Sequence, residues 1–300
     1  MKPNKGMIVL FLAPAVLSYV LIFLYPTLRT IYLGFFEVND FLGAELTYRG
    51  LGNYLQLFRT PLFLQSLRNI FVVWTVGGAA IFGLIFLFTT LLTSGIRGAK
   101  FFRAVIYLPN LIPVVAMTTM WSQYIYNPRY GLLKTFFTAI GLEGLAAIQW
   151  TSQDLLFWSM LIAYVWGGVG WYLLIILAGY ERIPPDYYDA AKVDGANQVQ
   201  TFFAVTLPLL RDVLRVTLVM WSIGVINLFA FPRTFTPVGS QPRQTMTPVI
   251  YLYSLAFGQS GQAGLVQVGK AAAAGVILLV LVVLTYMLFS RLIRQSEFEY

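Results

Sequence analysis

A glycine-rich run ending at Lys270 is the stretch of this sequence whose spacing comes closest to nucleotide chemistry. Residues 264–271 read Gly-Leu-Val-Gln-Val-Gly-Lys-Ala. A phosphate-binding loop has such a lysine, but it needs Ser or Thr at the next position to hold Mg²⁺, and it follows a strand. Ala271 stands at that position and begins a long apolar stretch. We therefore predict no nucleotide site here, and expect the Lys270 ammonium group to reach the aqueous edge of a membrane helix.

Two residue types that carry much enzyme chemistry are absent, because the 300 residues contain neither Cys nor His. Without Cys there is no disulfide framework, thiol nucleophile or Cys-ligated metal. Without His there is no Ser-His-Asp triad, no His proton shuttle and no typical zinc site. If this chain is an enzyme, it is therefore an unusual one.

The composition predicts an integral membrane protein. Hydrophobic residues make up 58% of the chain and charged residues only 11%, and the mean hydropathy is +0.73. Soluble globular proteins have about 25% charged residues. The formal net charge of +8 then favours membrane orientation and contact with anionic lipid. Nucleic-acid binding is the poorer explanation, because no basic cluster is interleaved with exposed aromatics.

Six apolar runs approach the length of about 20 residues that a membrane span needs. Lipid offers no partner to unpaired backbone groups, so each run should be helical, which predicts an all-α membrane protein with six transmembrane helices. The fifth run is the shortest, and we expect Arg211 and Arg215 to snorkel at its base. The six runs cover approximately residues 7–27, 69–93, 104–126, 155–179, 216–231 and 271–289.

The first run has a basic start, so a signal peptide is the alternative to an uncleaved anchor. Only Met7–Leu12 would form the apolar core ahead of the cleavage-like Ala13-Pro14-Ala15, and the apolar run continues to Tyr25. A signal peptide needs a core of about 7–15 residues. We therefore predict an uncleaved membrane anchor.

Basic residues in short segments predict the orientation of the chain. With six spans, three basic groups fall on one side, which the positive-inside rule makes cytoplasmic. We therefore expect both termini to be cytoplasmic, although long outer loops also carry arginines that weigh less in this rule. The three groups are Lys2 with Lys5, Arg97 with Lys100 and Arg103, and Arg291 with Arg294.

The cytoplasmic loop between the fourth and fifth runs, at about 181–208, has the densest group of acidic residues. Pro184-Pro185 can open a helix, because proline lacks only a donor that the first turn leaves free. Asp186 and Asp189 lie near that helix start, where the helix dipole favours anions. Gly195 can end the helix with a turn. We predict a short helix, a tight turn and a second short helix; the alternative is an ordinary solvated loop.

The motif within this loop resembles one family. It reads Asp189-Ala190-Ala191, three residues, Gly195, nine residues, and Val205-Thr206-Leu207-Pro208. This is similar to the EAA loop, Glu-Ala-Ala, three residues, Gly, nine residues, Ile-x-Leu-Pro, of permease subunits of binding-protein-dependent ABC importers. Asp replaces Glu and Val replaces Ile, and both changes keep the chemistry.

Other segments resemble the carbohydrate-uptake branch of that family, the permeases of the maltose and glycerol-phosphate type. One departure lies in the loop after the fifth run, where the family has Gly-Gly-Pro followed by Thr and this chain has Gly239-Ser240-Gln241-Pro242, with Thr245 or Thr247. The similar segments are Phe11–Ala15, Tyr25-Pro26, Leu51–Tyr54, Ser66–Asn69, Phe101–Arg103, Leu108–Asn110, Trp121 and Asn127–Leu133.

The resemblance implies a type I ABC importer permease in a prokaryotic cell (inner) membrane. Residues 1–64 would form an N-terminal tail, the first span and an outer loop. Residues 65–290 would form the transmembrane domain, and residues 291–300 a cytoplasmic tail. The implied partners are a second permease subunit, a cytoplasmic ATPase dimer that binds ATP and Mg²⁺, an extracytoplasmic solute-binding protein and membrane lipid, with no nucleic acid.

The same resemblance implies how the loop couples to the ATPase. Asp189 would make polar contacts with the ATPase surface, and Ala190 and Ala191 would pack into its cleft. Gly195 would form the turn between the two short helices, and Pro208 would close the motif. This chain would then supply half of the pathway and none of the ATPase chemistry, so the resemblance implies that it is not an enzyme and has no catalytic residues, no metal site and no bound cofactor of its own.

Polar and aromatic residues within the spans are candidates for the substrate pathway. Asn227 interrupts an apolar run, and such a residue faces a water-filled path or bonds to another helix; both remain open. Aromatic faces beside amides suit sugars, although Trp and Tyr also concentrate at membrane interfaces. The other candidates are Trp221, Ser222, Asn110, Trp121, Gln123 and Trp166.

Span interiors without basic residues favour a neutral sugar, oligosaccharide or polyol as substrate. A glycerol-phosphate-type or other non-sugar solute is the alternative within the family. A secondary transporter is the alternative outside it, but ion coupling would need charged residues at membrane depth. No inverted repeat is evident either.

Overall fold

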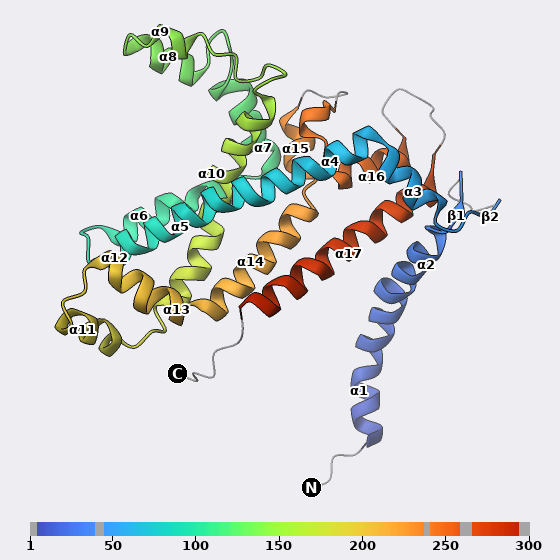
Figure 1. The fold of residues 1–300 in the computed structure, drawn as a ribbon, viewed down its shortest axis with the longest axis horizontal. Coiled ribbons are helices and arrows are strands. Elements are labelled where there is room, and N and C mark those ends of the chain that lie inside the picture. The colour runs from blue at the N-terminus through green and yellow to red at the C-terminus, as the bar shows by residue number, and fades with distance from the viewer. Residues whose placement is uncertain (1–4, 40–44, 237–240, 259–265, 294–300) are drawn as a thin grey trace. The chain divides into compact units, whose positions relative to one another are not determined.

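The computed structural model describes residues 5–39, 45–236, 241–258 and 266–293 (Figure 1). This part of the chain is helical except for one antiparallel pair of short strands, β1 (Phe36–Glu37) and β2 (Thr47–Tyr48). The prediction of an all-α membrane protein is therefore confirmed. The chain forms two compact units, one from residues 1–64 with 248–280 and the other from residues 65–247 with 281–300.

The first unit contains a long apolar helix with no covering partner within the described chain. Gly6–Leu33 is continuous over 28 residues, and none of its most apolar window is buried. Such a helix is typical of a segment whose side chains face lipid or another subunit. The elements of this unit are α1 (Lys5–Ser18), the π-helix η1 (Tyr19–Leu24), α2 (Tyr25–Leu33), β1, β2, α3 (Gly52–Arg59), α16 (Pro248–Phe257) and the first parts of α4 (Pro61–Val72) and α17 (Val268–Leu292).

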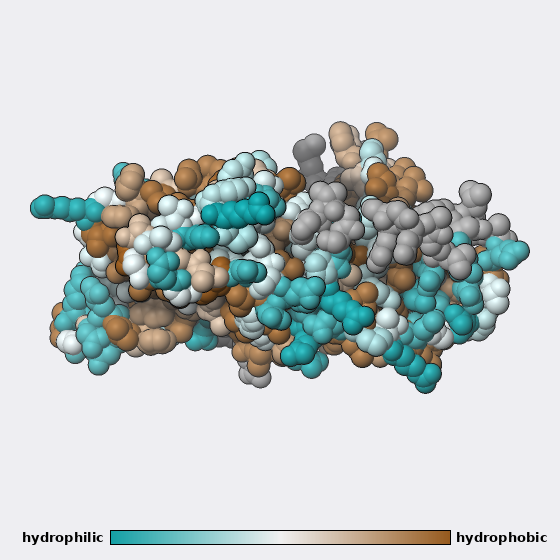
Figure 2. All heavy atoms as spheres, turned by 90° about the horizontal axis from the view of Figure 1, so that it is seen from above, coloured by the Kyte–Doolittle hydropathy of each residue, from teal (hydrophilic) through white to brown (hydrophobic). Residues whose placement is uncertain are grey.

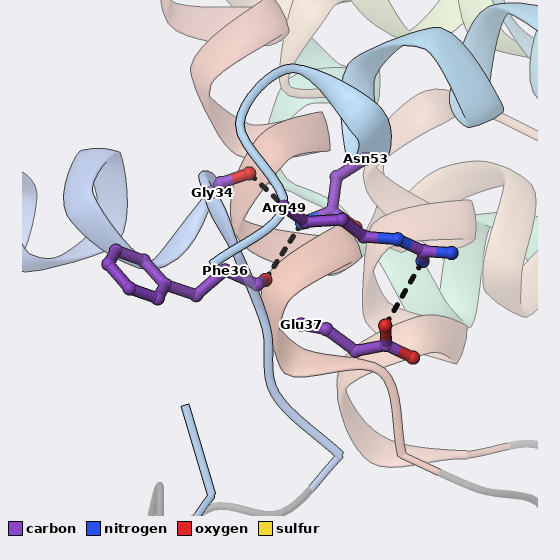
Figure 3. A network of polar contacts seen from close by, with 5 residues as sticks. All are labelled: Gly34, Phe36, Glu37, Arg49 and Asn53. Carbon is purple, nitrogen blue, oxygen red and sulfur yellow. Dashed lines mark hydrogen bonds and ion pairs between the residues drawn. The ribbon is translucent and has the colours of Figure 1, made fainter. Parts of the chain in front are cut away.

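Asn53 fixes the chain where α2 ends and the strand pair begins (Figure 3). Its buried Nδ2 donates to the carbonyl oxygens of Gly34 at 3.0 Å and Phe36 at 2.8 Å. The first bond satisfies a carbonyl that the end of α2 leaves without an intrahelical donor, and the second holds the first residue of β1. Arg49 also forms a 3.5 Å ion pair with Glu37, but both side chains are exposed, so this pair adds little stability.

The second unit is arranged along α10 (Leu156–Tyr180), which packs most extensively against α5 (Gly78–Thr93). Helices α8 (Leu132–Ala139) and α9 (Glu143–Ala146) lie beyond the start of α10, and α11 (Pro185–Val193) lies beyond its end (Figure 1). The other elements are η2 (Val73–Gly77), α6 (Ala99–Tyr107), η3 (Leu108–Leu111), α7 (Val114–Thr119), η4 (Met120–Ile125), α12 (Gln198–Thr201), η5 (Phe202–Thr206), α13 (Leu207–Leu209), α14 (Arg211–Ile226), α15 (Ala230–Phe235) and η6 (Arg243–Thr245).

Small residues on α10 allow its neighbours to approach closely. A β-carbon on Gly170 would lie 2.6 Å from the carbonyl oxygen of Ile106 and from Nδ2 of Asn110. Membrane helices pack through such small residues, because lipid provides no hydrophobic force to drive them together. Any larger residue at Gly170 would therefore push α6 and η3 away from α10.

Four helices of the described chain are long and apolar enough to cross a membrane: Gly6–Leu33, Pro61–Thr93, Leu156–Tyr180 and Val268–Leu292. They coincide with four of the six predicted runs. Apolar side chains also reach the surface over much of the face drawn in Figure 2. A soluble protein that buries its apolar side chains in a core would not expose this much apolar surface.

The third predicted run is not one straight helix. Ala99–Leu111 and Val114–Ile125 meet at an angle of 95°. Pro113 explains the break, because proline has no N–H to continue the helix and disfavours helical backbone at the residue before it. Ile112 accordingly has extended backbone, with φ −79° and ψ 124°. Counted as one broken span, this pair raises the number of candidate spans to five.

The fifth predicted run also differs from the structure. Helix α14 covers Arg211–Ile226, begins with charged residues and ends before Asn227, and α15 starts separately at Ala230. Its 16 residues are shorter than a typical span. The count of six spans therefore stays a prediction.

Candidate functional site

The loop at 181–208 begins with the short helix that its prolines predict. Pro184 caps α11 and Pro185 is its first residue, while Asp186 lies in the first turn and Lys192 in the last. A proline at the first position and charges that oppose the helix dipole both stabilise such a helix. The predicted short helix is therefore present, with its bounds at Pro185–Val193.

Gly195 ends α11 in the left-handed conformation, with φ +74°. The amide of Ala196 donates to the Ala191 carbonyl at 2.9 Å, and the amide of Gly195 donates to the Lys192 carbonyl at 3.0 Å. This pair of bonds is the Schellman arrangement, which favours glycine because of its backbone angles. A β-carbon on Gly195 would meet no atom within 4 Å. Glycine is needed here for its conformation and not for space.

A second helical segment starts two residues later. The side chain of Asn197 accepts from the Gln200 amide and the Gln200 side chain accepts from the Asn197 amide, both at 2.9 Å. This reciprocal capping fixes where α12 begins. Helices α12, η5 and α13 then follow without a break to Leu209, and the Pro208 carbonyl accepts from Arg211 Nε at 3.0 Å. The helix, turn and second helix of the prediction are all present.

Helix α11 has an inner and an outer face. On the inner face, the Tyr188 ring lies 5.3 Å from the Tyr180 ring, and Ala191 is only 8% exposed. On the outer face, Tyr187 and Val193 are exposed, Val193 by 87%.

The third residue of the outer face is Ala190, which is also exposed. Side chains three residues apart share one side of a helix, so Tyr187, Ala190 and Val193 form a single apolar strip. Ala191 points inward, so only one of the two motif alanines is open to an approaching surface. Tyr187 and Val193 are not among the predicted site residues, although their spacing from Ala190 indicates them.

Asp189 lies beside this strip and forms a 2.9 Å ion pair with Lys192. Both side chains are largely exposed, so water weakens their attraction and the pair contributes little to stability. The Asp189 carboxylate can therefore exchange Lys192 for a donor on another surface at little cost.

A cavity of about 620 Å³ lies between this loop and the ends of α5 and α10. Phe202 lines it from the loop, and Thr89 and Thr93 line it from α5. Thr89 is 1% exposed, and its Oγ1 has no hydrogen-bond partner among the described residues. Such an unpaired hydroxyl is unusual in a folded interior.

Three of the predicted pathway residues lie close to α10. The rings of Trp121 and Trp166 are 5.5 Å apart in an edge-to-face arrangement. Trp121 Nε1 and Asn110 Nδ2 are buried donors that bond to no acceptor in the described part of the chain. Trp166 is 40% exposed. Trp121 and Trp166 thus form one aromatic pair, while Asn110 lies beside Gly170 of the same helix α10; both unpaired N–H donors are buried and lie near the break in the third span.

The remaining pathway candidates are engaged elsewhere. Buried Trp221 donates through Nε1 to the Trp74 carbonyl at 3.1 Å, and Trp74 Nε1 donates to Ser222 Oγ at 2.8 Å. Asn227 is exposed at the end of α14 and donates through Nδ2 to the Ile223 carbonyl at 2.9 Å. Trp221 and Ser222 therefore hold α14 against η2, and they would reach a pathway only if these bonds broke. Gln123 is exposed.

Several positions from the sequence analysis fall outside the described residues: Lys2, Gly239, Ser240, Gly264 and Arg294. Lys270 lies within α17, which starts at Val268. Within the described part of the chain, no group of three or more Asp and Glu side chains is placed to hold a metal ion.

Residues 79–296 match the family described as "Binding-protein-dependent transport system inner membrane component". The chain is 30% identical over 281 residues to the probable ABC transporter permease YurN of Bacillus subtilis, covering 93% of this chain and 92% of that protein. It is 28% identical over 283 residues to NgcF, a diacetylchitobiose uptake permease of Streptomyces coelicolor, covering 89% of this chain and 76% of that protein.

One solved structure supports the fold. It is a bacterial alginate ABC transporter in complex with an alginate pentasaccharide-bound periplasmic protein. A chain of that complex has a TM-score of 0.77 with this protein at 20% identity, and the match covers 97% of this chain and 96% of that one. The predicted permease fold is therefore confirmed.

Proposed function

Because this chain belongs to the family of binding-protein-dependent transport system inner membrane components, we propose that it is one permease subunit of an ATP-driven importer of a neutral sugar, oligosaccharide or polyol. It forms half of the translocation pathway. A second permease subunit supplies the other half, and a separate ATPase dimer binds ATP and Mg²⁺. An extracytoplasmic solute-binding protein delivers the substrate.

The outer face of α11 is the observation that carries this proposal. Tyr187, Ala190 and Val193 present an apolar strip on a helix outside the long spans, with Asp189 beside it. Exposed apolar patches rimmed by polar residues mark interaction sites. The ATPase docks on this strip, Asp189 binds donors on its surface, and Gly195 sets the angle between the two helical segments.

Ala191 and Pro208 shape this docking surface from within. The Ala191 carbonyl accepts the bond that closes the Gly195 turn, and its small side chain lets α11 pack closely on the rest of the loop. Pro208 ends the motif where α13 meets α14. A permease thus receives the effect of ATP hydrolysis through a rigid loop that has no nucleotide chemistry of its own.

The charge distribution favours a neutral substrate. No Lys or Arg occurs in residues 73–93, 104–128, 155–180 or 216–232. An anionic substrate would require basic side chains along its path. NgcF is named for diacetylchitobiose, whereas the alginate importer takes an acidic polysaccharide, so an anionic glycoside is the second candidate.

The pathway proposal centres on Asn110, Trp121 and Trp166, whose rings and free N–H groups suit a sugar's apolar face and hydroxyls. Asn227, Trp221 and Ser222 complete it in a state in which α14 has moved. The chain lies in the cell membrane of a prokaryote with both termini cytoplasmic. Its tail and first span occupy residues 1–64, its transmembrane domain residues 65–290, and its last tail residues 291–300.

The test is reconstitution with and without the ATPase subunit and the binding protein. Val193→Asp should abolish co-purification of the ATPase, because it places a charge in the apolar strip. Leu132→Asp is the matched control, since Leu132 is also well exposed (64%) but lies on α8 beyond the opposite end of α10; this variant should retain the ATPase. Uptake by this chain without any ATPase would refute the proposal in favour of a secondary transporter.

A further inference from the structure

Aromatic rings form an unbroken series of contacts that starts in the 181–208 loop. Phe202 of η5 lies 5.5 Å from Phe86 of α5, measured between ring centroids. Phe86 lies 6.3 Å from Phe82, and Phe82 lies 6.2 Å from Tyr172 of α10. These separations are within the range of favourable aromatic pairs, about 4.5–7 Å. The loop is thus in ring contact with the middle of the helix bundle.

The series continues to α15, near the other end of α10. Tyr172 lies 5.8 Å from Trp221 of α14, and Trp221 lies 6.0 Å from Tyr164. Tyr164 in turn lies 5.2 Å from Phe231 of α15. Thr234, also on α15, accepts a 2.9 Å hydrogen bond from Thr118 Oγ1 of α7. Helix α7 leads directly into η4, which carries Trp121.

Trp221 is held at the centre of the series. Its Nε1 donates to the Trp74 carbonyl, and a β-carbon on Gly78 would lie only 2.8 Å from that nitrogen. The indole therefore fills the space left by a glycine. A cavity of about 480 Å³ borders it together with Phe82 and Phe86, so these rings have room to move, and their close contacts can pass a displacement from one ring to the next.

The first contact of this series, between Phe202 and Phe86, lies at the cavity beside the loop. Thr89 and Thr93 of α5 face the loop across the cavity, whereas the Phe202 ring, which also lines it, touches Phe86. The Phe202 ring therefore joins the loop to α5 by a direct contact at the edge of this cavity.

We propose that the rings from Phe202 to Phe231 transmit the position of the loop at 181–208 to α15 and to the broken third span. Phe86 is the positioning residue at the first ring contact, between the loop and α5. This inference rests on the proposed coupling to an ATPase. Apart from Trp221, which is also a pathway candidate, it assigns a role to side chains outside both the apolar strip of α11 and the proposed pathway. Leucine at position 86 keeps the apolar bulk but removes the flat ring that bridges to Phe202.

The absence of Cys from this chain allows a direct test. Ala230, exposed at the start of α15, is replaced by Cys in the full complex in proteoliposomes. Labelling by a membrane-impermeant maleimide is then timed with and without ATP and vanadate. The same measurement is made with Phe86→Leu, Phe86→Tyr and, as a matched control, Phe157→Leu. Phe157 is a half-buried phenylalanine whose ring pairs with Trp158, outside the series.

Phe86→Leu should reduce the nucleotide-dependent change in labelling rate by at least threefold and lower the number of substrate molecules imported per ATP. Phe86→Tyr and Phe157→Leu should retain both values. An undiminished labelling response in Phe86→Leu would overturn the inference while leaving the proposed function intact. Loss of the response in the Phe157→Leu control would also overturn it. A parent Ala230→Cys complex that binds ATPase but shows no nucleotide response would count against both.

Discussion

Replacement of Gly195 should uncouple transport while the protein still inserts into the membrane. The residue has φ +74°, and a β-carbon added to it would meet no atom within 4 Å. A side chain here therefore meets no steric obstacle within the chain and is disfavoured only by the left-handed backbone. That penalty is about 1–2 kcal/mol for an ordinary L-residue. Since about 1.4 kcal/mol is a factor of ten, the native turn should lose roughly five- to thirtyfold in population relative to alternatives.

A graded series separates backbone strain from obstruction of the docking surface. Gly195→Asn adds a side chain but tolerates the left-handed region, so it should retain ATPase stimulation by loaded binding protein to within about twofold. Gly195→Ala should reduce that stimulation about fivefold or more, by strain alone. Gly195→Arg adds bulk and charge to the same strain and should reduce it most.

The assay is substrate-stimulated ATP hydrolysis by the reconstituted complex, with membrane insertion checked by extraction. Normal stimulation in the Gly195→Arg complex would refute the assignment of this turn to coupling. Equal losses in Asn and Ala variants would show that obstruction, and not backbone angle, decides the effect.

Three further predictions concern other sites of the molecule. Trp121→Leu should slow uptake at least tenfold with unchanged basal ATP hydrolysis, because it removes a ring and an unpaired donor. The control Trp158→Leu, at an exposed tryptophan on α10, should transport normally. Equal uptake rates in the two variants would contradict the proposed pathway. Asn53→Ala removes one buried and one partly buried hydrogen bond and should destabilise the protein by about 2 kcal/mol. A thermal unfolding midpoint equal to that of the unmodified protein would exclude this. Thr89→Val removes an unpaired buried hydroxyl and should leave the unfolding midpoint unchanged or higher, whereas Thr217→Val removes a bonded one and should lower it; the reverse order would show that Thr89 is paired in the working protein.

The loop could be predicted in detail from the sequence because its structure depends on local interactions. Pro185 at the first helical position and Gly195 after the last turn, both predicted, each act within a few residues. The capping pair Asn197 with Gln200 is equally local but was not predicted. Such signals are written in adjacent positions and do not depend on the rest of the fold. The same holds for the long apolar runs, whose length alone indicates a membrane span.

The 95° break in the third run was missed although its cause, Pro113, is local, because hydropathy treats this proline as one more residue of an apolar run. The other details that were missed depend on contacts between residues that lie apart in the sequence. Which motif alanine faces outward depends on where Tyr188 packs against Tyr180. Trp221 and Ser222 looked like pathway residues because their partner Trp74 is far away in the sequence and its hydrogen bonds leave no periodic pattern.

The uncovered first helix is longer than the hydrocarbon region of a bilayer is thick. Gly6–Leu33 has 28 residues, which corresponds to about 42 Å at 1.5 Å per residue. The hydrocarbon region is only about 30 Å thick, so the helix must tilt or extend beyond it. Arg29 lies in the last turns of this helix with its side chain exposed, so the guanidinium can snorkel toward the headgroups. A thicker membrane would leave less of the helix outside the hydrocarbon and oblige it to stand more upright.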